Sequence, residues 1–159
     1  MNETRTATLF GDNMVLQQGI RNPVWGWAQP GQKVVVSLAG KSARGKARKD
    51  GRGLVKLPAL PAGGPHEMTI AAERVLTLKN VMIGEVWLAS GQSNMEWPLN
   101  ASKDAEAEVR AANFPAIRMF KVAPVASVEP KADVQGRWDV CSTATAEAFS
   151  AVGYLVPTA

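Results

Sequence analysis

Residues 81–94 read VMIGEVWLASGQSN, and their pattern predicts the fold class of the part of the chain that they open. Residues 81–89 are almost continuously apolar, which is typical of a strand that is buried on both faces of a parallel sheet. The polar residues 90–94 follow directly. Open α/β sheets carry their sites just beyond the carboxyl ends of such strands. We therefore expect residues 81–89 to form a buried strand of an α/β domain, with Trp87 in its core and a candidate site in the turn that follows.

Ser93 is the candidate nucleophile in this turn. Its hydroxyl is expected to face the space beyond the strand end, and its backbone N–H to serve there as one oxyanion donor. Gly91 is expected to let the backbone turn tightly. The spacing is not the G-x-S-x-G nucleophile elbow, because position 95 is Met95. On spacing alone, a turn or cap formed by Ser93 and Asn94 explains the same residues.

Helical and extended patterns alternate after this turn. Ser102 is expected to cap a helix that carries the i,i+4 pair Glu106 and Arg110. Residues 117–122 alternate weakly and predict a strand, and residues 123–136 predict a loop. Residues 143–156 predict one further helix with an apolar stripe formed by Phe149, Val152 and Val156.

The first 80 residues have a different character and predict an all-β module. Short candidate strands at 24–27, 33–38, 54–57, 68–71 and 75–78 are separated by residues that favour turns. This spacing favours a β-sandwich of jelly-roll or Ig-like type. We expect residues 1–80 to form the sandwich and residues 81–159 to begin an α/β domain. About 70 residues remain after the buried strand, fewer than a doubly wound domain takes, so we expect this domain to be incomplete in the chain.

The charge of the chain is unevenly distributed. Residues 1–80 carry 12 Lys and Arg against 5 Asp and Glu, and most of the excess lies in residues 41–56. Arg44, Lys46 and Arg48 alternate with small residues, and Asp50 and Gly51 follow as a hairpin turn signal. No aromatic residue is interleaved to stack on bases. We interpret the basic stretch as the wet face of a hairpin whose charges protect an edge strand, and we expect no nucleic-acid partner.

Several classes of protein are excluded by composition. The chain of 159 residues has no run of 18 apolar residues, so we expect no membrane-spanning helix. The single cysteine, Cys141, excludes an internal disulfide and a cysteine-rich zinc site, and we expect it to act as a small hydrophobe. The single histidine, His66, is expected in a surface turn rather than beside Ser93. The first residues show no signal peptide, and the compartment stays open.

Three stretches resemble one family of enzymes. Residues 84–99 (GEVWLASGQSNMEWPL) resemble the first catalytic block of sialate O-acetylesterases, which are carbohydrate esterases of the SGNH, or GDSL-like, type. Residues 9–18 (LFGDNMVLQQ) with residues 24–28 (VWGWA) resemble the opening of the family's β-domain. Residues 148–154 (AFSAVGY) resemble a helix downstream of the first block. The resemblance covers essentially the whole chain but only the early part of the family's length.

The resemblance implies a fold and an activity. It implies that the second domain is the truncated start of an SGNH-type α/β/α domain. It also implies that Ser93 is the nucleophile and a backbone oxyanion donor, with Gly91, Gln92 and Asn94 supporting the turn. The implied reaction is hydrolysis of O-acetyl esters of sialic acid or related sugars, with no metal and no organic cofactor.

The resemblance also implies what the chain lacks. The family takes its base from a late Asp-x-x-His block, and no such block occurs in this sequence. We therefore expect the chain to be inactive by itself and to need the missing C-terminal part of the hydrolase domain. The family is often periplasmic or secreted.

Trp97 is a further candidate site residue, and two other functions stay open. Trp97 follows Ser93 by four residues and is a candidate for lining a substrate pocket, although a packing role explains it equally well. A non-catalytic carbohydrate-binding or accessory β-module and a truncated gene fragment both stay open as alternatives.

Overall fold

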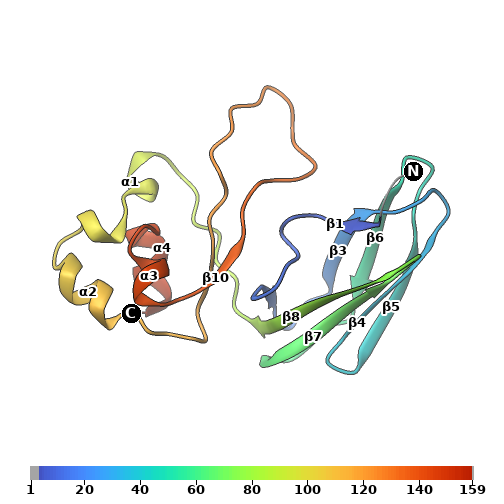
Figure 1. Cartoon of the computed structure of the whole chain (residues 1–159), viewed down its shortest axis with the longest axis horizontal. Helices are drawn as coiled ribbons and strands as arrows, with labels where there is room; N and C mark the ends of the chain where they lie inside the picture. Colours follow the sequence, from blue (N-terminus) through green and yellow to red (C-terminus); the bar gives the residue numbers. More distant parts are fainter. Residues whose placement is uncertain (1–3, 159) are drawn as a thin grey trace. The chain divides into compact units, whose positions relative to one another are not determined.

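The computed structural model describes residues 4–158, and the chain divides into two compact units. The first unit comprises Met1–Val86 and Val122–Arg137, and the second comprises Trp87–Lys121 and Trp138–Ala159. Among the described residues, every helix and only two short strands belong to the second unit. Figure 1 follows these elements by colour along the chain. The expectation that the N-terminal part of the chain is mainly β is confirmed.

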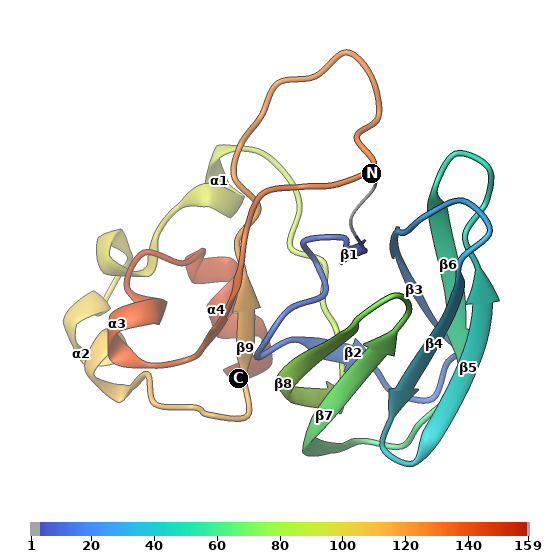
Figure 2. The ribbon, with the colours of Figure 1, turned by 45° about the vertical axis from the view of Figure 1, so that its right-hand side comes forward.

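Two sheets form the first unit. The five-stranded sheet has the order β2 (Val15–Gln17), β8 (Val75–Gly84), β7 (Gly63–Ala71), β4 (Lys33–Leu38) and β5 (Lys41–Lys46). The three-stranded sheet has the order β1 (Arg5–Thr6), β3 (Asn22–Trp27) and β6 (Arg52–Leu57). Neighbouring strands are antiparallel except β2 and β8, which are parallel. Figure 2 shows the long β7–β8 hairpin.

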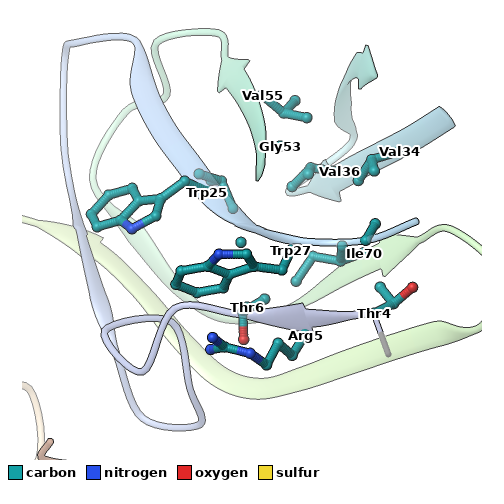
Figure 3. Close-up of a pocket in the computed structure, with 13 residues that line it drawn as sticks. Thr4, Arg5, Thr6, Trp25, Trp27, Val34, Val36, Gly53, Val55 and Ile70 are labelled. Atoms are coloured by element: carbon teal, nitrogen blue, oxygen red, sulfur yellow. The ribbon is translucent and has the colours of Figure 1, made fainter. Parts of the chain in front are cut away.

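Alternating apolar side chains build a core shared by the two sheets. In β4, Val36 and Leu38 are buried whereas Lys33 is exposed. A cavity of about 30 Å³ remains in this core, and Figure 3 shows residues of both sheets around it, among them Val36 and Val55. Full burial of one aliphatic side chain contributes about 1.5–3 kcal/mol. Because alternate residues of these strands are apolar, each strand presents one apolar face. Burial of these faces against each other holds the two sheets together.

The basic stretch lies at an edge of the five-stranded sheet, as expected. Lys41, Arg44 and Lys46 are exposed on β5, which is the last strand of that sheet. The expected hairpin is placed differently, because β5 pairs with β4 and β6 joins the other sheet. Ala39 and Gly40 both have positive φ, at 48° and 73°, and they form the two-residue turn between β4 and β5. Positive φ at both central residues is what the favoured two-residue hairpin turn requires.

Gly26 allows β1 to lie close against β3. A Cβ atom at Gly26 would lie 2.3 Å from the backbone oxygen of Arg5. We expect Gly26→Ala to displace β1 and to lower the free energy of unfolding by about 1–3 kcal/mol, as overpacking typically does. Gly53 lies opposite Gly26 on β6, and a Cβ there would meet nothing within 4 Å. Gly53→Ala is therefore the matched control in chemical denaturation, and equal losses in the two variants would contradict the close approach.

Asp133 ties the segment 122–137 to the N-terminal part of the first unit. Its carboxylate accepts hydrogen bonds from the backbone N–H groups of Thr8 (2.8 Å) and Val134 (3.0 Å) and from the Arg5 guanidinium (3.0 Å). The guanidinium also lies 3.6 Å from the centre of the Trp27 ring, and Figure 3 shows the two side chains stacked. Burial alone would raise the pKa of Asp133, but these hydrogen bonds together hold it below its usual value.

This lowered pKa predicts a pH-dependent stability. Because the pKa of Asp133 is lower in the folded than in the unfolded state, the ionised carboxylate stabilises the fold above the unfolded value, which is about 3.9. That contribution is lost as the pH falls through the folded value. We expect Asp133→Asn to lower the free energy of unfolding by about 1 kcal/mol at pH 7 and by much less near pH 2. Urea denaturation across this range measures the difference, and a constant difference would contradict the prediction.

The prediction of one buried strand over residues 81–89 is wrong in its second half. The strand β8 ends at Gly84, after pairing parallel with β2 and antiparallel with β7. Beyond it, Val86, Trp87 and Leu88 are 45%, 68% and 92% exposed, so the expected core position of Trp87 is also wrong. A strand needs backbone partners, and within residues 4–158 none continues the ladder past Gly84. The parallel sheet expected after residue 80 is therefore not evident in the described part of the chain.

The second unit packs short helices and a two-stranded sheet around a small core. Its elements are α1 (Ser93–Glu96), η1 (Leu99–Ala101), α2 (Ala105–Ala111), β9 (Arg118–Phe120), β10 (Trp138–Val140), α3 (Thr143–Ala146) and α4 (Ala151–Thr158). The core consists of Leu99, Ala112, Met119, Cys141, Ala146, Ala151 and Tyr154. Burial raises the pKa of the Cys141 thiol, and the expectation that this residue packs as a small hydrophobe is confirmed.

The helix expected after Ser102 begins later than predicted. The Ser102 hydroxyl donates a hydrogen bond of 2.6 Å to the carbonyl oxygen of Leu99 and so closes η1. The helix α2 starts after Asp104, whose left-handed φ of 56° marks the change of direction. The expected pair of Glu106 and Arg110 forms a salt bridge on this helix and is confirmed. The loop predicted over 123–136 contains no helix or strand.

The single helix predicted over 143–156 is interrupted. Residues 147–150 separate α3 from α4 because their backbone pairs with the segment that follows α1. The N–H of Leu99 donates to the carbonyl oxygen of Phe149 (2.9 Å), and the N–H of Ala151 donates to that of Trp97 (2.8 Å). The predicted apolar stripe is also wrong, because Val152 is exposed whereas Tyr154 is buried.

Candidate active site

Ser93 is the first residue of α1 and is exposed. Gln92 precedes it with extended backbone (φ −114°, ψ −152°), and its carbonyl oxygen accepts a hydrogen bond of 2.9 Å from the N–H of Met95. The first N–H groups of a helix have no carbonyl partner one turn earlier. Ser93 therefore presents a hydroxyl and a first-turn amide at the same residue, which is the pair of groups expected from the sequence.

The residues around Ser93 shape the turn through their backbone rather than through their side chains. Gly91 does not have the left-handed backbone that favours glycine, and a Cβ at this position would make an ordinary contact of 3.5 Å with Met95. Within residues 4–158, the side chains of Gln92 and Asn94 make no hydrogen bond with Ser93. The turn is defined by the carbonyl of Gln92 rather than by these side chains.

The described residues provide no base for Ser93. No side chain in residues 4–158 accepts a hydrogen bond from the Ser93 hydroxyl. His66 belongs to β7 of the first unit, where it is half-buried and lies across from Val81 in the register. A serine hydroxyl without an adjacent base is a weak nucleophile at neutral pH.

Ser150 links α1 to α4 within the second unit. Its hydroxyl oxygen lies 3.6 Å from the sulfur of Met95 and accepts a hydrogen bond of 3.1 Å from the N–H of Gly153. Gly153 is closely surrounded, because a Cβ there would lie 3.1 Å from the Phe149 ring, which is a tight contact, and 3.4 Å from the Cβ of Ala89. The structure thus brings residues 148–154 against the Ser93 block. The sequence predicts a helix over 148–154 but carries no signal for the contacts of Ser150 and Gly153.

Trp97 lies next to the contact between α1 and α4. It directly follows α1, is 54% exposed, and donates its indole N–H to the carbonyl oxygen of Ala101 at 2.9 Å. A ligand would therefore meet its ring rather than its N–H group. The geometry is compatible with both roles considered for this residue.

Groups that could hold a metal ion and helices that could cross a membrane are both absent from residues 4–158. Across residues 4–158, no three His, Cys, Asp or Glu side chains are grouped so that they could hold a metal ion. In the same part of the chain, none of the helices has both the length and the apolar character needed to span a membrane.

Comparison with known proteins places the chain near one group of enzymes. No family model matches the sequence. It is 31% identical to human (Homo sapiens) sialate O-acetylesterase over 144 residues and 32% identical to that of Rattus norvegicus over 150 residues. These alignments cover 82% and 83% of the chain but only 27% of each relative. The chain is thus a distant homologue of sialate O-acetylesterases and spans about a quarter of their length.

A solved structure agrees with this relation. The chain matches the crystal structure of a carbohydrate acetylesterase from Xanthomonas citri with a TM-score of 0.94 and 40% sequence identity. The match covers 98% of this chain and 36% of that protein. The fold described above therefore recurs as a part of a larger carbohydrate acetylesterase.

Proposed function

We propose that this chain, a homologue of part of the sialate O-acetylesterases, is the nucleophile-bearing portion of a carbohydrate esterase that removes O-acetyl groups from sialic acid or related sugars. The observation that supports this most strongly is an exposed Ser93 at the start of α1, in a fold that matches a carbohydrate acetylesterase over 98% of the chain. No metal and no organic cofactor enter the proposed reaction.

The proposed reaction is an acyl transfer. The Ser93 oxygen attacks the acetyl carbonyl, the sugar alkoxide leaves with a proton, and water then hydrolyses the acetyl-serine. The Ser93 amide donates a hydrogen bond to the oxyanion. The proton of Ser93 passes to a general base outside the described residues, and such a base is commonly worth about 10²–10⁴-fold in rate.

The proposal assigns a domain to each part of the chain. Residues 1–80 form a sandwich module of jelly-roll or Ig-like type, and residues 81–159 begin an SGNH-type α/β/α domain. The match to a carbohydrate acetylesterase over 98% of this chain, which extends into the block around Ser93, supports the second assignment.

A chimera tests the proposed function. In it, this chain replaces the matching 36% of the Xanthomonas citri carbohydrate acetylesterase. We expect the chimera to release acetate from O-acetylated sialic acid and from 4-nitrophenyl acetate, and the 159-residue chain alone to remain at the background rate. A chimera that melts cooperatively but is inactive would contradict the proposal. Activity of the chain alone would show that the base lies within it.

A non-catalytic carbohydrate-binding role is the second candidate function. The exposed rings of Trp87 and Trp97 favour it, because aromatic faces pack against the apolar faces of sugars. Titration of the 15N-labelled chain with a sialylated glycan measures this directly through the indole N–H signals. Saturable shifts at Trp97 together with an inactive, folded chimera would favour the binding role.

A further inference from the structure

Three polar side chains meet where the parallel pair β2 and β8 ends. The Gln17 amide nitrogen donates to one carboxylate oxygen of Glu85 (2.9 Å), and the Gln18 amide nitrogen donates to the other (2.5 Å). The Gln17 amide oxygen accepts a hydrogen bond of 2.8 Å from the backbone N–H of Val86. Both oxygens of Glu85 and both ends of the Gln17 amide are therefore engaged. All these residues belong to the first unit.

These side chains continue the strand pairing after the backbone ladder has stopped. The last register pair is Gln17 with Gly84, and the N–H of Gln18 donates to the carbonyl oxygen of Gly84 at 2.8 Å. The backbone oxygen of Gln17 is held in turn by the side chain of Asn22, which is buried. The two glutamines thus lie on a fixed backbone and reach one and two residues beyond the end of β8.

The segment after β8 has little other support. Residues 85–92 form no helix or strand. Within the described part of the chain, Val86 is the only residue from 85 to 92 whose backbone N–H is hydrogen-bonded, and its acceptor is Gln17. Ser93 follows seven residues after Val86. Restraint at the start of this segment therefore depends on Gln17 and Glu85.

The contacts around Glu85 are of the stronger, charge-assisted kind. Hydrogen bonds from Gln18 and then Gln17 hold the pKa of the Glu85 carboxyl below its usual value, so it is ionised at neutral pH. The first unit contains a simpler pair for comparison. Gln29 donates one hydrogen bond of 3.2 Å to Glu73, and neither residue holds a backbone group beyond a strand end.

We propose that Gln17, Gln18 and Glu85 form a clamp that holds the chain at Glu85 and Val86, where this part of the first unit ends. The clamp belongs to the first unit and does not depend on the proposed function of Ser93. The clamp also gives a shared role to two stretches, 9–18 and 84–99, which the sequence singled out separately.

Reversal of the donor and acceptor roles tests the clamp in the 159-residue chain. Gln17→Glu places a second carboxylate against Glu85, so we expect the Val86 amide to exchange about three- to tenfold faster, as the loss of one hydrogen bond implies. We also expect the 15N order parameters of residues 85 and 86 to fall from a rigid value of about 0.85 toward about 0.6. The double variant Gln17→Glu with Glu85→Gln restores a donor on residue 85 and an acceptor for Val86, and both readouts should return to wild-type values.

Controls separate the clamp from a general loss of stability. Gln29→Glu makes the same change beside Glu73 and should leave the signals of Glu85 and Val86 unchanged. Glu85→Gln alone removes a charge without adding one and should give intermediate exchange, so it replaces Gln17→Glu if that variant unfolds.

Three results would overturn the proposal. They are wild-type exchange of Val86 in Gln17→Glu, faster exchange at Val86 with no change of mobility at residues 85 and 86, and no recovery in the double variant. None of these measurements involves ester hydrolysis, so failure of the clamp is distinguishable from failure of the proposed function.

Discussion

Ser93→Ala in the chimera is expected to lower kcat for acetyl-ester hydrolysis by at least about 10³-fold, because the residual rate would come only from binding and oxyanion stabilisation. The exposed hydroxyl of Ser93 packs against nothing that its loss would disturb. KM and the melting temperature should therefore change little. Steady-state kinetics with 4-nitrophenyl acetate and with an O-acetylated sialic acid measure the effect.

Ser90 provides the matched control for this variant. It is an exposed serine in the same segment, three residues before Ser93, and the proposed reaction gives it no role. Ser90→Ala should retain activity within about twofold, in line with the small effects of surface substitutions. Turnover that survives in Ser93→Ala, or that is lost equally in both variants, would reject Ser93 as the nucleophile.

Leu99→Ala is expected to have the largest effect on stability. Leu99 is fully buried in the core of the second unit and also pairs its backbone with Phe149. Truncation of a buried leucine costs about 2–5 kcal/mol, through lost burial and the cavity that remains. Guanidinium denaturation followed by amide exchange should show this loss in residues 87–121 and 138–158.

Leu88 is the control for this truncation, because it is a leucine of the same unit whose side chain is almost completely exposed. Leu88→Ala should change the free energy of unfolding by no more than about 0.5 kcal/mol. Comparable losses in the two variants would mean that Leu88 is covered in solution and would contradict the exposure described above.

The strands of the first unit were predictable because their signal is local. The expected strand at residues 33–38 coincides with β4, and its alternation directly reports the two faces of a half-buried sheet. The protected edge at β5 was also predictable from the run of charges at residues 41–46. The assignment of β6 to the other sheet was not, because turn residues such as Asp50 and Gly51 do not reveal which strand pairs with the next.

The second unit was harder to predict because distant backbone pairing overrides local periodicity. The helical pattern over 143–156 is interrupted where residues 147–151 pair with residues 97–100, and nothing within the pattern announces that contact. The apolar run over 81–89 predicts burial correctly only up to Ile83. Apolar composition reports what a strand can bury, whereas its pairing depends on segments elsewhere in the chain.

The candidate site was found in the sequence only in part. Ser93 was identified from its place after an apolar run and from the resemblance of its surrounding block. Ser150 and the clamp residues Gln17 and Glu85 were missed, because their contacts join stretches separated by about 55 and 68 residues. Such contacts leave no periodic trace in one sequence.

The parallel pairing of β2 with β8 has a consequence for synthesis on the ribosome. Gln18 and Glu85 are 67 residues apart, so translation at about 5–20 residues per second separates their emergence by roughly 3–13 s. During that interval β2 waits without its partner, while the hairpins between them can already form from local contacts. The end of β8 is therefore anchored only after the other strands of the first unit have been translated.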